Sequence, residues 1–210
     1  MLTSIIFDID GTIIDNETAI LKSLQATLKE EGMEYELADL RFALGIPGKE
    51  SLRKLNIQDI DNVHAKWSEK ERQFTRQSEV FKGLEGVIAA IAQSDLNIGI
   101  VTSKTRYDYD TQFSKMPVSS HFDIAVVVED TAHHKPHPEP LLLCLEKLGA
   151  SGQEAIYIGD SIYDNQCAKN AGAQFGLAYW GSKTKEGYHP DFVFKEPGDI
   201  LDMLKKYNLL

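Results

Sequence analysis

Two aspartates separated by one residue, Asp8 and Asp10, follow a short apolar run near the start of the chain, and Gly11 comes directly after them. The apolar run at 4–7 predicts a strand that is buried on both faces of a sheet. Two buried carboxylates this close repel each other, and each loses favourable hydration. An isolated pair of this kind often marks only a turn. In a buried setting, however, the pair is expected to bind a cation or to take part in a reaction.

Three further groups of polar residues come at or soon after the ends of other apolar runs. Because the carboxyl ends of parallel strands meet at one edge of a sheet, where ligands bind, we expect all four groups to converge. Each group alone has a purely structural explanation, such as a helix cap or a solvated charge. The set in this order indicates a shared site. Its further members are Thr102 and Ser103, then Lys135 and Pro136, then Asp160 and Asp164.

These residue types predict phosphoryl transfer. Asp8 is the candidate nucleophile, since a carboxylate can attack phosphorus and form an aspartyl-phosphate. Asp10 is the candidate general acid and base. Asp160 would complete a Mg²⁺ site with Asp8 and the backbone carbonyl of Asp10, because this cation prefers oxygen ligands. Asp164, one helical turn further on, is expected to orient a metal-bound water or Lys135.

Positive charge and hydrogen-bond donors are needed to bind the phosphate. Thr102 and the backbone N–H of Ser103 are the candidates for its non-bridging oxygens, since a hydroxyl followed by a helix N-terminus binds anions. Lys135 would place a positive charge near both the nucleophile and the phosphate. Lys49 and Arg53 are candidates for contacting an anionic substrate such as phosphoglycolate, and solvated helix charges are the alternative interpretation.

The pattern along the chain predicts an α/β fold. Helical patterns, including 84–94 and 138–148, separate most of the predicted strands, which indicates a parallel sheet covered on both faces. The interval 16–81 has helical patterns and no convincing strand, so it is predicted to be an all-α cap inserted into a core of residues 1–15 and 82–210. Such an insert can hinge as a lid. The predicted strands lie near 4–7, 98–101, 124–128, 155–158, 175–179 and, more weakly, 192–194.

Composition excludes several classes of protein. With 32 acidic and 22 basic residues, the net charge of −10 disfavours nucleic acid or an anionic membrane as a partner. A small phosphate substrate therefore needs a local cationic pocket. Cys144 and Cys167 have no metal-binding spacing and are predicted to be packing residues. We expect a cytoplasmic location, because the first residues show no export signal and no apolar stretch is long enough to span a bilayer.

The four groups together resemble the motifs of the haloacid dehalogenase superfamily of phosphotransferases, and the resemblance covers essentially the whole chain. It implies a Rossmann-like core, a helical cap, magnesium and an aspartyl-phosphate intermediate. Asp10 favours phosphoryl transfer, since the dehalogenases lack this second aspartate. The chain looks most similar to phosphoglycolate phosphatases and related pyrophosphatases, which implies a phosphatase for a small monoester resembling phosphoglycolate. The matching stretches are 8–12, 102–103, 135–136 and 159–164.

Other functions remain open on the sequence alone. A pyrophosphatase is one alternative, and a β-phosphoglucomutase is another. The mutase branch usually has a histidine early in the first cap helix and an arginine in the cap loop. Here the histidine is missing, and Gly48 lies about where the arginine would fall. Lys49 could partly substitute for that arginine. A signalling module phosphorylated on aspartate is the non-enzymatic alternative, although its aspartate would follow a mid-chain strand. A binding protein without activity would lack Asp8 or Asp10. A monomer and a homodimer are both compatible with the sequence.

Overall fold

The computed structural model describes residues 2–210, so Met1, which the predicted core includes, lies outside the described residues. Six parallel strands form one sheet: β1 (Ser4–Phe7), β4 (Asn97–Val101), β5 (Ile124–Val126), β6 (Ala155–Gly159), β7 (Gln174–Ala178) and β8 (Phe192–Phe194). Their spatial order is β5-β4-β1-β6-β7-β8. The predicted α/β fold is therefore confirmed. The strand predicted at 124–128 ends two residues early, because the chain turns into a 3₁₀-helix at Val128–Asp130.

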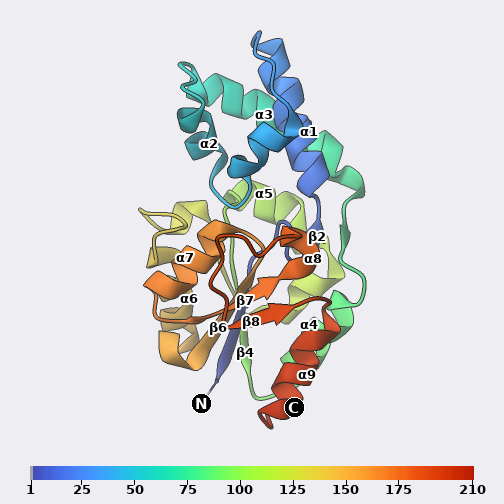
Figure 1. Cartoon of the computed structure of the whole chain (residues 1–210), viewed down its shortest axis with the longest axis vertical. Helices are drawn as coiled ribbons and strands as arrows, with labels where there is room; N and C mark the ends of the chain where they lie inside the picture. Colours follow the sequence, from blue (N-terminus) through green and yellow to red (C-terminus); the bar gives the residue numbers. More distant parts are fainter. Residues whose placement is uncertain (1) are drawn as a thin grey trace.

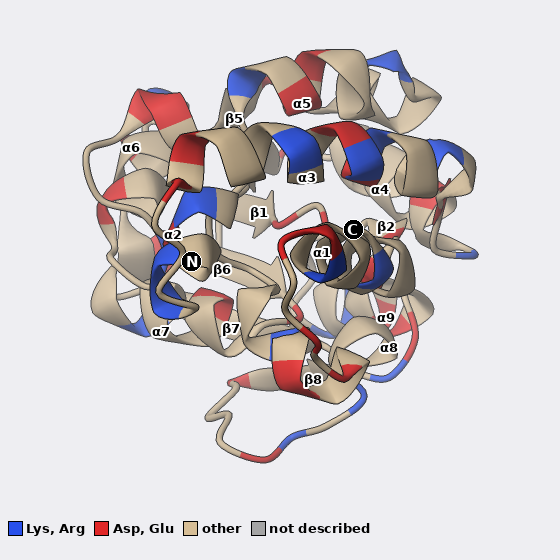
Figure 2. Cartoon of the chain, turned by 90° about the horizontal axis from the view of Figure 1, so that it is seen from above, with Lys and Arg blue, Asp and Glu red and all other residues tan. Residues whose placement is uncertain are grey.

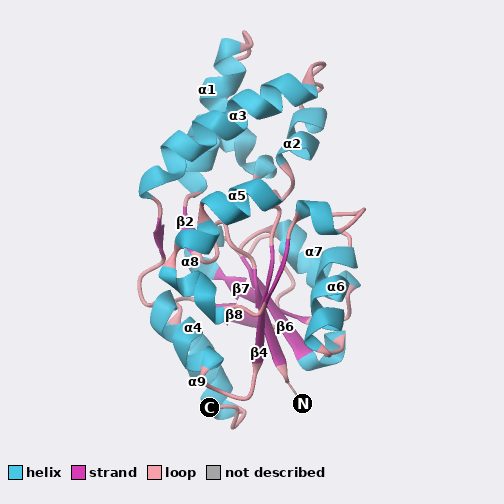
Figure 3. Ribbon diagram, turned by 180° about the vertical axis from the view of Figure 1, so that it is seen from behind, coloured by secondary structure: helices cyan, strands magenta, loops and turns pink. Residues whose placement is uncertain are grey.

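The sheet is buried on both faces, as the apolar runs predict. In β1, Ile5 and Phe7 pack into one apolar cluster and Ile6 packs into the other. The predicted roles of Cys144 and Cys167 as packing residues are confirmed, since both belong to the second cluster and are free thiols. The helices α4 (Leu84–Ala92) and α9 (Gly198–Lys206) cover the first face, and α6 (Glu139–Leu148) and α7 (Ile162–Asn170) cover the second (Figure 3).

Strand register brings the functional segments to one edge of the sheet. Phe7 lies opposite Ile100 of β4 and Ile158 of β6. The residues that follow these three strands therefore leave the sheet side by side. β4 and β5 lie on one side of β1, and β6, β7 and β8 lie on the other, so the strand order reverses direction at β1. Open parallel sheets bind ligands in the crevice at such a switch point.

A group of helices lies beyond this edge of the sheet, at the top of Figure 1. It occupies the interval that the sequence assigns to the cap, although the domain boundaries themselves stay a prediction. The group has an apolar cluster of its own, in which Leu24, Leu40, Leu52 and Trp67 are buried. The elements are α1 (Glu17–Glu30), η1 (Leu37–Ala43), α2 (Gly48–Lys54), α3 (Ile60–Phe74) and η2 (Thr75–Gln77).

The cap joins the core through a short two-stranded ribbon. β2 (Ile14–Asp15) pairs antiparallel with β3 (Glu79–Val80) at the point where the chain enters and leaves the cap. The expectation that 16–81 contains only helices is therefore wrong at β3. A strand of two residues is too short to produce an alternating pattern, so the sequence carries no signal for it.

Charges of both signs interleave along α3 on the outer face of the cap (Figure 2). Two ion pairs join α3 to α1, with Lys66 Nζ 2.6 Å from Glu31 Oε1 and Lys70 Nζ 2.8 Å from Glu30 Oε1. Pairs as exposed as these stabilise a protein only slightly. Within residues 2–210, none of the helices combines the length and the apolar character that crossing a bilayer requires.

Replacing Gly181 by alanine is expected to destabilise the junction between α8 (Tyr179–Ser182) and the loop after β1. A Cβ atom at 181 would lie 1.8 Å from the carbonyl oxygen of Gly11 and 2.9 Å from Cβ of Asp160. This overlap should lower the free energy of unfolding by about 1–3 kcal/mol in urea denaturation. Gly86→Ala is the matched control, because a Cβ there meets nothing within 4 Å in the middle of a helix. It should raise the free energy of unfolding by roughly 0.5–1 kcal/mol. Equal midpoints for the two variants would contradict this packing.

Candidate active site

Lys135 lies between two buried aspartates at the carboxyl edge of the sheet. Its Nζ donates to Asp8 Oδ1 at 2.9 Å and to Asp164 Oδ1 at 2.8 Å. Burial alone would lower the pKa of Lys135, but the attraction of Asp164 and Asp8 outweighs it, so the pKa lies above its usual value. Lys135 therefore carries its positive charge at any physiological pH. The predicted convergence of Asp8, Lys135 and Asp164 is found in the structure.

Asp164 has no oxygen free for a further ligand. Its Oδ1 accepts from Lys135 and from the Tyr157 hydroxyl at 2.9 Å. Its Oδ2 accepts from the backbone N–H of Ser161 at 3.0 Å and from the Ser161 hydroxyl at 2.5 Å. These bonds let Asp164 hold Lys135 in place, one of the two tasks predicted for it from the sequence.

Asp8 and Asp160 form a site that suits a hard divalent cation. One oxygen from each of Asp8, Asp160 and Asp164 lies within 4.8 Å of the other two. Asp160 Oδ1 accepts from the Thr12 hydroxyl at 3.1 Å. Burial raises the pKa of both Asp8 and Asp160, and mutual repulsion with Asp164 adds to the effect. A cation with oxygen ligands, such as Mg²⁺, would offset this repulsion, and Asp8 and Asp160 are the residues that would hold it.

Asp10 faces the same pocket but is bound by different partners. Lys104 Nζ lies 2.9 Å from Asp10 Oδ1, and the Asn16 side-chain amide donates to the same oxygen at 2.5 Å. Lys104 is almost fully buried. Its burial opposes the positive charge, yet attraction to Asp10 and Glu71 leaves the pKa of Lys104 above its usual value. Asp10 is therefore held at a fixed position beside a permanent positive charge.

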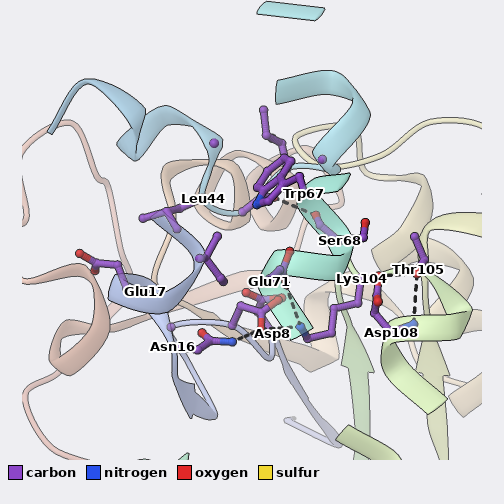
Figure 4. Close-up of a pocket in the computed structure, with 18 of the residues that line it drawn as sticks. Asp8, Asn16, Glu17, Leu44, Trp67, Ser68, Glu71, Lys104, Thr105 and Asp108 are labelled. Carbon is purple, nitrogen blue, oxygen red and sulfur yellow. Dashed lines mark hydrogen bonds and ion pairs between the residues drawn. The ribbon is translucent and has the colours of Figure 1, made fainter. Parts of the chain in front are cut away.

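Helix α3 of the cap supplies the wall opposite these carboxylates (Figure 4). A cavity of about 70 Å³ lies between cap and core. Burial raises the pKa of the Glu71 carboxyl to about 7, even though Lys104 attracts it. Burial also lowers the pKa of His64, with nearby Lys49 as a smaller cause. The cap residues that line the cavity are Glu17, Ile20, Ala43, Leu44, Gly45, Ile46, Gly48, His64, Trp67, Ser68 and Glu71.

The predicted phosphate-binding pair occupies the expected edge, with one difference. Ser103 lines the cavity, and its hydroxyl donates to the Gly45 carbonyl of the cap at 2.9 Å. Thr102 is buried, and its hydroxyl accepts from the backbone N–H of Lys104 at 3.3 Å. The helix expected to start directly after Ser103 is absent there: α5 (Arg106–Thr111) begins later and is capped by Thr105. Any anion binding at this loop therefore depends on loop N–H groups and hydroxyls rather than on a helix end.

Lys49 and Arg53, proposed from the sequence to contact the substrate, do not line this cavity. Both are exposed on α2, and Lys49 Nζ pairs with Asp61 Oδ1 at 2.7 Å. The structure supports the alternative interpretation, in which both are solvated helix charges.

The loop that carries Lys135 is fixed from outside the pocket by Glu139. Its carboxylate accepts from the backbone N–H groups of Ala132 and His133, each at 3.0 Å. The ring of His133 lies 2.7 Å from the same carboxylate and stacks on His137. These contacts define the path of the chain on both sides of Lys135.

Sequence reasoning missed Lys104, Glu71 and Asn16. Lys104 follows the predicted Thr102-Ser103 pair directly, so its place after a strand end was an available signal. Glu71 lies one helical turn after Trp67, and a carboxylate on the same face as a buried tryptophan is a weak sign of a lined cavity. Asn16 has no comparable signal, because its contact with Asp10 depends on the turn between them.

Comparison with known proteins identifies the family. Residues 5–178 match the family model described as haloacid dehalogenase-like hydrolase. The chain belongs to this family. It is therefore a hydrolase by family, and the resemblance found in the sequence is confirmed.

Individual relatives of this haloacid dehalogenase-like hydrolase match along their whole length. Pyrophosphatase PpaX of Bacillus velezensis is 30% identical over 209 residues, which is 95% of each chain. Pyrophosphatase PpaX of Oceanobacillus iheyensis is 25% identical over 97% of each chain. A Lactobacillus plantarum protein whose proposed activity is that of a phosphoglycolate phosphatase has a similar structure, with a TM-score of 0.89 and 28% identity over 97% of this chain and 100% of that one.

Replacing Lys135 by methionine should leave Asp8 and Asp164 buried without a cation. Losing one partner of a buried ion pair typically lowers the free energy of unfolding by about 3–5 kcal/mol. We expect this loss in EDTA at pH 8, and a smaller one at pH 5, where Asp8, whose pKa burial raises to about 7, can take up a proton instead. Urea denaturation at the two pH values measures it. Lys22→Met, at an exposed position of α1, is the control and should change stability by no more than about 0.5 kcal/mol. A Lys135 variant as stable as the control would refute the role of this ion pair.

Proposed function

We propose that this protein is a magnesium-dependent phosphatase that hydrolyses a small phosphate monoester through an aspartyl-phosphate on Asp8. The observation that carries the proposal is the placement of two aspartates with separate cationic partners in one cavity: Asp8 beside Lys135 and Asp10 beside Lys104. The two carboxylates are thus available for different tasks.

The proposed reaction has two steps. A carboxylate oxygen of Asp8 attacks phosphorus and the ester P–O bond breaks, while Asp10 donates a proton to the leaving oxygen. Asp10 then takes a proton from water, whose oxygen attacks the same phosphorus and releases phosphate from Asp8. Lys135 stabilises the negative charge that builds up on the transferring group in both steps.

Asp8 and Asp160 are the residues that would hold Mg²⁺. The ion would supply positive charge that offsets the repulsion between Asp8 and a phosphate dianion. Asp164 supports this site indirectly by orienting Lys135, and Thr12 does so by holding Asp160. The proposed partner is a small phosphate, and no role for nucleic acid is proposed.

Phosphoglycolate and pyrophosphate are the first substrates to assay. The sequence predicts a monoester resembling phosphoglycolate, with pyrophosphate as an alternative, and the names of the relatives support both as candidates. Lys49 and Arg53, the candidates for contacting a substrate carboxylate, lie outside the cavity. The geometry therefore supports the wider class, small phosphate monoesters.

The β-phosphoglucomutase alternative finds no support in the cavity. Gly48 lines it at about the position where that branch has an arginine. A Cβ atom at Gly48 would lie 2.7 Å from His64 Nε2 and 3.1 Å from a ring carbon of Trp67. A side chain at position 48 would therefore overlap His64 and Trp67 in their present positions. The alternative of a signalling module phosphorylated on aspartate is also less well supported, since it does not account for a cap that encloses Asp8 and Asp10.

Replacing Asp8 by asparagine should abolish turnover while the protein stays folded. Asparagine keeps the shape of the side chain but is a poor nucleophile, so kcat should fall by more than about 10³-fold. The measurement is phosphate release from p-nitrophenyl phosphate with Mg²⁺, with circular dichroism to check folding. Asp95→Asn, in an exposed turn, is the control and should retain wild-type activity. Retention of wild-type kcat by the Asp8 variant would overturn the nucleophile assignment.

Mg²⁺ should stabilise the protein more at pH 8 than at pH 5. Burial raises the pKa of Asp8, Asp160 and Glu71, so the folded state binds more protons than the unfolded chain between about pH 4 and 7. The stability that these groups contribute is present at low pH and is lost as the pH rises through their folded pKa values. The metal-free protein should therefore become less stable from pH 5 to 8. Mg²⁺ competes with protons for Asp8 and Asp160, so its effect should grow over the same range. Thermal unfolding in EDTA and in Mg²⁺ tests this, and an equal or larger Mg²⁺ shift at pH 5 would contradict it.

A further inference from the structure

The substrate end of the cavity has few groups that could receive a negative charge. Lys104 and Lys135 are the lysines among the lining residues, and within the described chain no arginine joins them. Lys135 is taken up by Asp8 and Asp164. Lys104 Nζ lies 2.9 Å from Asp10 Oδ1, 3.2 Å from Gln112 Oε1 and 3.9 Å from Glu71 Oε1. Both cations are thus already shared among carboxylates.

Three of the other donors of the lining are directed away from the cavity or already used, which leaves the Ser68 hydroxyl and the His64 ring. The indole N–H of Trp67 donates to the Ser23 hydroxyl at 3.0 Å, inside the cap. The Ser103 hydroxyl donates to the Gly45 carbonyl. Thr105 donates to Asp108 at 2.6 Å. A carboxylate or phosphate on the leaving group, which brings only acceptors, would meet uncharged donors in this wall and two lysines that already pair with carboxylates.

Two acceptors of the wall, by contrast, are free to receive hydrogen bonds. Asn16 is 4% exposed; its NH₂ group donates to Asp10, and its Oδ1 has no hydrogen-bond partner among residues 2–210. The carboxylate of Glu71 has its nearest cation at 3.9 Å, which is too long for a hydrogen bond. Figure 4 shows Asn16, Glu71 and Lys104 around Asp8. A buried acceptor without a partner is unfavourable unless a ligand supplies the donor.

We propose that the cavity selects phosphate monoesters whose leaving group is an uncharged alcohol with a further hydroxyl group, and that it discriminates against leaving groups carrying a carboxylate or a phosphate. The inference rests on the proposed phosphatase function. Asn16 Oδ1 and the Glu71 carboxylate accept hydrogen bonds from the hydroxyl groups of such an alcohol. Glu71 repels a second anion, and unpaired or like-charged groups are the means by which a site rejects a competitor. The small cavity favours a leaving group of few carbons.

A matched pair of substrates tests the proposal. Phosphoglycolate and 2-hydroxyethyl phosphate both have two-carbon leaving groups and differ only in carrying a carboxylate or a hydroxymethyl group. At pH 8, a carboxyl group with a pKa of about 7 is mostly ionised. The wild-type enzyme with Mg²⁺ should then show a kcat/KM at least about tenfold higher for 2-hydroxyethyl phosphate, which corresponds to about 1.4 kcal/mol. Pyrophosphate should also be a poorer substrate than 2-hydroxyethyl phosphate.

Glu71→Gln identifies the residue responsible. The substitution removes the charge and adds a donor at nearly the same volume, so it should reduce the preference for 2-hydroxyethyl phosphate by about fivefold or more, mainly through better use of phosphoglycolate. Glu69→Gln is the matched control, because Glu69 lies on the exposed side of the same helix and pairs with Arg72. It should leave the ratio of the two kcat/KM values unchanged.

The outcomes separate this inference from the proposed function. Absence of Mg²⁺-dependent turnover of p-nitrophenyl phosphate and of both test esters would overturn the phosphatase itself. Turnover with equal or better use of phosphoglycolate or pyrophosphate by the wild type would overturn the selectivity and leave the phosphatase standing. The wild-type ratio needs no variant, so this test holds even if Glu71→Gln folds poorly. A preserved preference in a folded Glu71→Gln protein would overturn the role of Glu71.

Discussion

Lys135 lies between Asp8 and Asp164, and this buried ion pair network is the constraint on which the site depends. Three aspartates, each with one oxygen within 4.8 Å of the other two, repel one another in a region from which water is largely excluded. Lys135 offsets only part of this repulsion, since the pKa values of Asp8 and Asp160 remain raised. The remaining repulsion is what a bound divalent cation would offset.

A buried cation beside a carboxylate also shapes the part of the site around Asp10. Asp10 has its own buried cation, Lys104, and this lysine also faces Glu71 of the cap. A single ammonium group thus connects the proposed general acid and base with the wall that contacts the leaving group. The charge of the cap wall and the position of Asp10 are therefore not independent, and a substitution at Glu71 is felt at both.

Parts of this arrangement could be predicted from the sequence because they depend on the sheet alone. Asp8, Thr102 and Asp160 each follow a buried strand, and adjacent parallel strands in register deliver the next residues to one edge. Predictions were weaker where contacts depend on how the cap meets the core, because no local periodicity encodes that approach. Glu71 was missed for this reason, and the roles of Lys49 and Arg53 stayed open between a substrate contact and a solvated charge, because exposure cannot be read from a short helical pattern.

The helix that follows the Thr102-Ser103 pair begins too far along the chain for its N-terminus to lie at Ser103. A hydroxyl residue caps a helix only if the chain turns at that point, and Thr105, two residues later, makes the capping bond instead. The ribbon of β2 and β3 could not be predicted because its contacts are distant in the sequence. Ile14 pairs with Val80 only when the two ends of the long insertion come together. Neither feature alters the fold class, which is set by the long apolar runs.

The buried residues of the cap cluster are distinct from those of the two clusters that flank the sheet. Because the two parts are stabilised separately, changes in the cap interior do not have to be compensated beneath the catalytic aspartates. Over evolutionary time, a lineage can therefore change the cap wall of the cavity while the aspartates at the sheet edge are inherited unchanged. Divergence to 25–30% identity along nearly the full length of the PpaX relatives is compatible with such separate change of the two parts.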